Sequence, residues 1–103
     1  MTNQAENNQT KKHQDFSEIC KIISKLNTAE DVNDLFKGLL TQSELDDIAQ
    51  RWNIIKMLDK KESQRSIAKK LSVSLCKITR GAKILKNEKS ILRQILFDES
   101  WRN

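Results

Sequence analysis

Residues 64–83, QRSIAKKLSVSLCKITRGAK, carry the residue types that could contact nucleic acid. Their apolar residues fall on one face of each of two short helices, which a polar turn at Ser72 separates. Seven Lys or Arg and no Asp or Glu occur between residues 63 and 87. A surface of one charge sign suits the phosphates of a duplex. The pattern predicts a helix-turn-helix that binds DNA.

Individual positions within this segment have expected roles. Ala68 is small enough to let the second helix cross the first closely, and Val73 follows the turn as a buried residue. Ser63 and Ser74 precede the two helices as N-caps. The residues expected nearest to base edges are Gln64, Arg65, Leu75, Cys76 and Thr79, and those expected at phosphates are Lys69, Lys77 and Lys83. The alternative is that the two helices close a small bundle and the charges form a solvated face.

The composition favours an all-α fold. A chain of 103 residues suits one domain with a modest core, and this one has no proline and only two glycines, Gly38 and Gly81, for tight turns. The net charge of +5 is uneven, since residues 1–50 carry −4 and residues 51–103 carry +9. The second half is therefore the predicted nucleic-acid-binding half.

Metal binding, membrane insertion and catalysis are all disfavoured. Cys20 and Cys76 lack the spacing of metal ligands, the single His13 cannot complete a zinc set, and Cys20 is expected to be a small core residue. No stretch is apolar enough for a bilayer span or a signal peptide, so we expect a cytoplasmic protein. No nucleophile and base, and no carboxylate pair, are placed to converge, so neither enzyme activity nor a cofactor is expected.

Six helices are expected after a disordered polar arm over residues 1–14. They cover about residues 15–26, 28–40, 41–58, 64–71, 74–86 and 87–101, within a single helical domain over residues 15–103. Wide apolar stripes on the first three helices and the last one exceed what a small monomer buries, which favours a homodimer. The alternative is that Phe16, Phe36 and Trp52 only fill a monomeric core.

Two consecutive segments carry a family resemblance. LTQSELDDIAQRWNIIKML (40–58), followed by SQRSIAKKLSVSLCKITRG (63–81), resembles the bacterial tryptophan (Trp) repressor family, and the similarity covers about residues 35–97. The resemblance implies an intertwined, six-helix homodimer that binds a palindromic operator when L-tryptophan is bound as corepressor. It also implies repression of genes for tryptophan biosynthesis or transport.

The resemblance further implies a set of ligand-binding residues. Arg51 and Arg80 would flank the indole, with Arg80 and Thr41 holding the carboxylate. Leu40 of the partner subunit would offer its carbonyl to the ammonium group, and Gly81 would allow close approach of the ligand. Guanidinium groups stack on aromatic rings and pair with carboxylates, which suits an aromatic amino acid. The ordinary alternatives are an ion pair of Arg51 with Asp47, a phosphate contact of Arg80, and a helix end at Gly81.

Ile84 completes the implied ligand set, at a position where the family has a serine near the ligand's ammonium group. Gly38 stands where a larger apolar residue is usual, and the turn before Ser63 is one residue shorter than usual. These departures leave an alternative function open, in which a DNA-binding regulator of this fold is constitutive or responds to a different small ligand.

Overall fold

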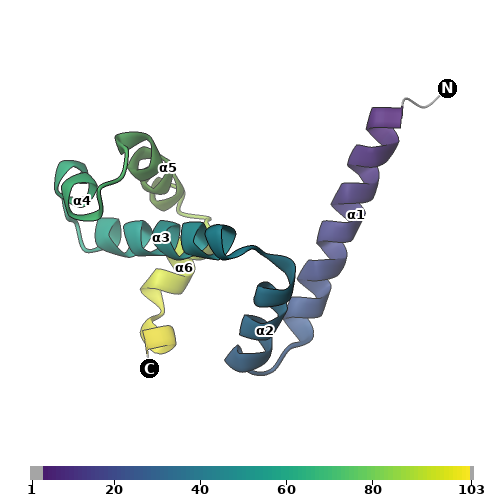
Figure 1. Cartoon of the computed structure of the whole chain (residues 1–103). Helices are drawn as coiled ribbons and strands as arrows, with labels where there is room; N and C mark the ends of the chain where they lie inside the picture. Colours follow the sequence, from purple (N-terminus) through teal and green to yellow (C-terminus); the bar gives the residue numbers. More distant parts are fainter. Residues whose placement is uncertain (1–3, 103) are drawn as a thin grey trace. The chain divides into compact units, whose positions relative to one another are not determined.

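The computed structural model describes residues 4–102, which form α-helices and one short 3-10 helix, with no strand among them (Figure 1). The elements are α1 (Gln4–Lys25), α2 (Ala29–Leu39), α3 (Gln42–Asp59), α4 (Gln64–Leu71), α5 (Leu75–Lys86), α6 (Ile91–Phe97) and the 3-10 helix η1 (Glu99–Arg102). The all-α prediction is confirmed for these residues. The last helix begins at Ile91, after the N-cap residue Ser90, rather than near residue 87.

The chain divides into two compact units, Met1–Thr41 and Gln42–Asn103. The single helical domain over residues 15–103 stays a prediction. The fully buried apolar side chains belong to the second unit. In the first unit, none of the side chains described from residue 7 onward is buried.

Part of the segment that we expected to be a disordered arm, residues 1–14, is helical in the structure. Residues 4–14 are helical, as the first turns of α1, while residues 1–3 lie outside the described part of the chain. This segment has no glycine or proline, and its Gln, Glu and Lys residues are good helix formers, so the amphipathic helix that follows can extend backward through it. Cys20 is exposed on the same helix and is not a core residue.

Helix α2 begins where the sequence predicts. Thr28 is its N-cap and accepts a hydrogen bond at Oγ1 from the backbone N–H of Asp31, 3.1 Å away. Apolar side chains nevertheless remain open to solvent in this unit, with Phe16 at 66 % and Leu39 at 52 % exposure. Phe16 is therefore not buried by the residues of this unit.

The second unit is built on the long helix α3, with α4 and α5 on one side of it and η1 on the other in Figure 1. Its core joins one isoleucine from each of three helices, Ile54, Ile67 and Ile78. Burial of a side chain of this size contributes about 1.5–3 kcal/mol. Ala68 and Val73 pack against this cluster, as the sequence predicts.

The connection between α4 and α5 has a defined geometry. Ser63 caps α4 by accepting a hydrogen bond from the N–H of Ser66 at 3.1 Å. Ser72 ends α4 in the left-handed conformation, with φ 53° and ψ 46°, and the N–H of Val73 donates to the carbonyl of Ala68. Ser74 occupies the N-cap position of α5 but makes no side-chain capping bond. The two helices and the turn at Ser72 are thus present at the expected positions.

Candidate functional site

A cavity of about 390 Å³ lies within the second unit, between α3, α5 and α6. It is lined by Ile48, Arg51, Trp52, Ile54, Ile55, Lys77, Arg80, Gly81, Ile84 and Leu92. The structure therefore brings together four residues of the predicted ligand set, Arg51, Arg80, Gly81 and Ile84. Its size is within the range typical of small-molecule sites, about 300–1,000 Å³.

The lining combines an apolar floor with two guanidinium groups. Ile54 and Ile55 are buried, at 1 % and 5 % exposure, whereas Arg51 on α3 and Arg80 on α5 are exposed. The structure records no ion pair between Arg51 and Asp47. An apolar floor below two planar cations suits a ligand with an apolar body and a carboxylate.

Leu40 and Thr41 are not among the residues that line this cavity. They belong to the unit Met1–Thr41, and the cavity is lined by residues of Gln42–Asn103 alone. Thr41 directly precedes α3. Their predicted contacts with a ligand carboxylate and ammonium group stay predictions.

Gly81 lies inside α5, so the interpretation as a helix end is wrong. The residue is buried, and a Cβ built on it would lie 3.2 Å from Cδ1 of Leu58 and 3.5 Å from Cγ2 of Ile54. These atoms belong to α3. At Gly81, α5 therefore lies close to α3, and the nearest atom to an added Cβ would be the terminal methyl group of the Leu58 side chain.

Sequence reasoning missed several residues of the cavity wall, Ile48, Trp52, Ile54, Ile55, Lys77 and Leu92. A signal was present on α3, where positions 48, 51, 52 and 55 share one helical face. Trp52 is half-buried, and its ring contacts Trp101 of η1 with centroids 5.2 Å apart and planes inclined at 69°. The sequence pattern alone predicts Trp52 only as a residue of a hydrophobic core.

A second, shallower depression of about 470 Å³ lies on the outer side of α5. We call it the α5 groove, and its residues are Leu75, Cys76, Thr79, Arg80 and Lys83. All five are exposed, and four of them belong to the predicted DNA-facing set. Leu75, at the start of α5, is 51 % exposed.

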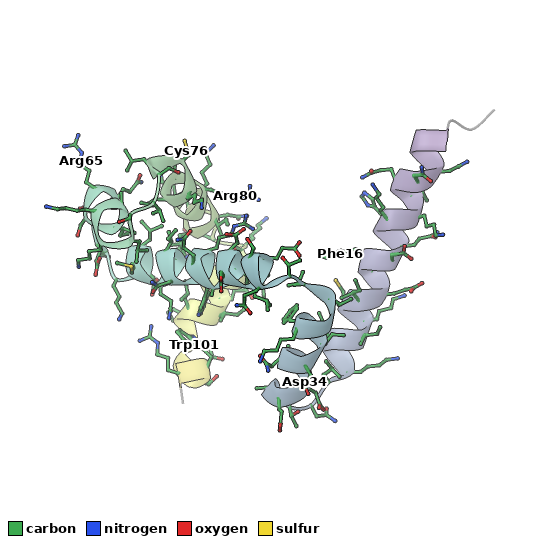
Figure 2. The ribbon with its side chains drawn as sticks, viewed as in Figure 1. Phe16, Asp34, Arg65, Cys76, Arg80 and Trp101 are labelled. Atoms are coloured by element: carbon green, nitrogen blue, oxygen red, sulfur yellow. The ribbon has the colours of Figure 1, made fainter. Side chains whose placement is uncertain are left out.

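The other residues that the sequence predicts to face DNA have varied surroundings. Gln64 and Arg65 begin α4 and are exposed, as is Lys69. Figure 2 shows Arg65 and Cys76 pointing away from α3, on the outer side of the α4–α5 pair. Lys77 differs, because its Nζ donates to Oε1 of Gln50 at 3.3 Å and its side chain lines the cavity.

Among the described residues, no group of three or more His, Cys, Asp or Glu is arranged to hold a metal ion. No helix within the same part of the chain has the length and apolar character needed to cross a membrane.

Comparisons with known proteins identify a family. The family model described as "Trp repressor protein" matches residues 14–100. The "Trp operon repressor homolog" of Xylella fastidiosa strain M23 is 38 % identical over 86 residues, which are 81 % of this chain and 94 % of that protein. The protein of the same name from Chlamydia caviae is 41 % identical over 73 residues, covering 70 % of this chain and 69 % of its own length.

A third relative, also named "Trp operon repressor homolog" and from Chlamydia trachomatis serovar D, is 40 % identical over 74 residues, or 71 % of this chain and 76 % of that protein. No solved structure matches significantly. The family match extends over most of the chain and includes both helices that carry the cavity arginines. This chain therefore belongs to the Trp repressor family.

Proposed function

We propose that this protein is a DNA-binding transcriptional repressor of tryptophan biosynthesis or transport genes, and that L-tryptophan activates it for operator binding. The observation that carries the proposal is the position of Arg80, which lines both the apolar cavity and the α5 groove. A single side chain thus belongs to the candidate ligand site and to the candidate DNA-binding surface. A ligand that fixes Arg80 also fixes part of the surface offered to DNA.

The chemistry of the cavity supports an amino acid with an aromatic side chain. Its apolar floor accepts the ring, and Arg51 and Arg80 offer cation–π contacts to the ring faces. Arg80 can also form a charge-assisted hydrogen bond with the carboxylate. L-Tryptophan is therefore the proposed ligand, in accordance with the repressor name of the relatives.

The exposed outer side of the α4–α5 pair supports the DNA-binding part of the proposal. In a helix-turn-helix, the second helix enters the major groove, which here would place Cys76 and Thr79 at base edges and Lys83 at a phosphate. Gln64 and Arg65 would reach neighbouring bases from the start of α4. Lys69 and Lys77 would contact phosphates.

A homodimer is part of the same proposal. Phe16 and Ile22 on α1, and Ile91 and Phe97 on α6, are each between 48 % and 92 % exposed, which is costly for side chains of this size. A second copy would cover them. Two-fold symmetry would also present two α5 helices to a palindromic operator.

Operator binding with and without L-tryptophan tests the proposal. A duplex selected from a random library by the tryptophan-saturated protein serves as the operator, and fluorescence anisotropy measures its dissociation constant. Three variants separate the contributions: Arg51→Ala changes the cavity alone, Lys83→Ala changes the α5 groove alone, and Arg80→Ala changes both. We expect L-tryptophan to tighten operator binding by wild-type protein about 5–150-fold.

Each variant has a distinct expected result. Lys83→Ala should weaken operator binding at every tryptophan concentration and keep the tryptophan-dependent factor. Arg51→Ala should need a higher tryptophan concentration to reach the same increase in operator affinity, because one of the two guanidinium groups proposed to contact the indole ring is lost. Arg80→Ala should abolish the tryptophan-dependent increase in operator affinity. Equal operator affinity with and without L-tryptophan in the wild-type protein would reject corepressor control.

The side chain of Ile84 supports a second candidate, a regulator of the same fold that responds to another apolar ligand or to none. Ile84 lines the cavity and offers no hydrogen-bonding group to an ammonium ion. The substitution Ile84→Ser tests this candidate. If L-tryptophan is not the ligand of the wild-type protein, the serine variant should bind it and the wild-type protein should not.

A further inference from the structure

Trp52 forms a wall of the cavity with a large aromatic surface. It lies on α3 between Ile48 and Ile55, one turn from each, and all three side chains line the cavity. Among the tryptophan and phenylalanine residues of the described chain, it is the one that reaches this cavity. An aromatic ligand placed there would therefore meet an aromatic partner as well as two guanidinium groups.

The Trp52 ring is held by contacts outside the cavity. Trp101 of η1 packs against it in an edge arrangement, with a centroid separation of 5.2 Å and an interplanar angle of 69°. Nζ of Lys56 lies 5.9 Å from the Trp52 ring centroid. In the geometry of an edge contact, the positive edge of one ring faces the negative face of the other, which fixes ring orientation better than aliphatic packing does.

Trp101 is held in place by ring contacts. Its indole Nε1 is buried and has no hydrogen-bond partner within the described residues. The guanidinium of Arg102 lies 4.9 Å from its ring centroid. Because leaving a buried N–H without an acceptor is unfavourable, the contact with Trp52 must be maintained by ring packing. A phenylalanine at position 101 can keep an edge contact and removes the unpartnered N–H.

We propose that Trp52 makes this cavity select aromatic over aliphatic amino acids, and that Trp101 is a positioning residue that acts through Trp52. The inference shares one premise with the proposed function, namely that the ligand of the cavity is an amino acid. It extends the ligand set of Arg51, Arg80, Gly81 and Ile84 by a residue that discriminates between side-chain classes. It also gives η1 a role in ligand selection, although η1 contributes no residue to the cavity wall.

Ligand selectivity is the quantity to measure. Calorimetry gives the dissociation constants of L-tryptophan, L-phenylalanine and L-leucine for the full-length protein without DNA. Trp52→Leu keeps an apolar wall and removes the aromatic ring. We expect its preference for L-tryptophan over L-leucine to fall about 2–10-fold, the range that one aromatic pair supplies. Ile95→Leu, a volume-conserving change at a residue of α6 that does not line the cavity, is the control and should keep the wild-type preference.

Position 101 separates positioning from general stability. Trp101→Phe should keep the wild-type preference for L-tryptophan over L-leucine. Trp101→Ala should reduce this preference by the same factor as Trp52→Leu does. In both variants Trp52 is the one remaining tryptophan, so its fluorescence should change when L-phenylalanine binds. A merely structural role would weaken the binding of aromatic and aliphatic ligands by the same factor.

The outcomes distinguish this inference from the proposed function. An unchanged preference in Trp52→Leu, or equal wild-type affinity for aromatic and aliphatic ligands, overturns the inference alone. Selective binding of aromatic ligands that leaves operator affinity unchanged supports the inference and overturns corepressor control. Absence of binding by all three amino acids overturns both.

Discussion

Replacing Gly81 with alanine tests how closely α5 must approach α3. Two opposing effects are expected in the free energy of unfolding. Alanine in a helix interior is favoured over glycine by about 1 kcal/mol. Against this, the new Cβ would lie 3.2 Å from Cδ1 of Leu58, closer than the optimal separation of about 3.5–4.0 Å between carbon atoms.

The structure indicates that these two effects nearly cancel. The contacts with Ile54 and Ile55 are at 3.5 Å and are ordinary. Leu58 is half-buried, and its terminal methyl group can move by a few tenths of an ångström, so the overpacking cost should be at the low end of about 1–3 kcal/mol. We expect Gly81→Ala to change stability by less than about 0.5 kcal/mol. Gly81→Val, with two further carbon atoms, should destabilise by about 2 kcal/mol or more.

A double-mutant cycle isolates the Leu58 contact. Urea unfolding at one fixed protein concentration, followed by circular dichroism, gives the stability of each variant. In a Leu58→Ala background the close contact is absent, so Gly81→Ala should stabilise by about 1 kcal/mol. Gly38→Ala is a matched control, because a Cβ there meets no atom within 4 Å and the gain from helix propensity should appear directly. Full additivity of the Gly81 and Leu58 substitutions would refute the reasoning.

The remaining predictions concern capping, DNA binding and assembly. Ser63→Ala should lower the free energy of unfolding in urea by about 0.5–2 kcal/mol, because the Ser63 side chain makes a capping hydrogen bond. Ser74→Ala should have little effect, because the Ser74 side chain makes none. Equal losses of stability in the two variants would contradict this. Arg65→Ala should relax base preference in a binding selection, and an equal loss of affinity for operator and random DNA would show that Arg65 does not contact bases specifically. Lys83→Ala should lower the affinity for every DNA sequence and reduce the slope of log affinity against log salt concentration by about one. Sedimentation of the wild-type protein should give twice the chain mass of 12.0 kDa. Phe16→Glu, which puts a charge on an exposed apolar position, should shift the protein toward monomer. A wild-type monomer at high concentration would exclude the dimer.

The parts of the fold that could be predicted are those that depend on residues close together in the sequence. The apolar spacing of Ile67 and Ile78 indicated the buried face of each helix correctly. Thr28 and Ser63 marked helix starts because their hydroxyl groups satisfy backbone N–H groups. For residues 4–14, a polar composition was interpreted as disorder, although polar residues with good helix propensity can extend an existing helix without burying any surface.

The cavity was predictable only in part. The family resemblance identified Arg51 and Arg80, and both line the cavity. Trp52 was missed, because periodicity places it on an apolar face without indicating whether that face meets a core or a cavity. Its contact with Trp101 joins residues far apart in the sequence, which no local pattern encodes. The contact of Gly81 with α3 was missed for the same reason.

The central claim is that ligand and operator binding are coupled through this protein, and calorimetry of L-tryptophan tests it most directly. Because coupling is reciprocal, the operator duplex must tighten tryptophan binding by the same factor by which tryptophan tightens operator binding, typically about 5–150-fold. The predicted result is tighter binding of L-tryptophan to the protein–operator complex than to the free protein, with the difference abolished in Arg80→Ala. Equal tryptophan affinities with and without operator in the wild-type protein would contradict the claim.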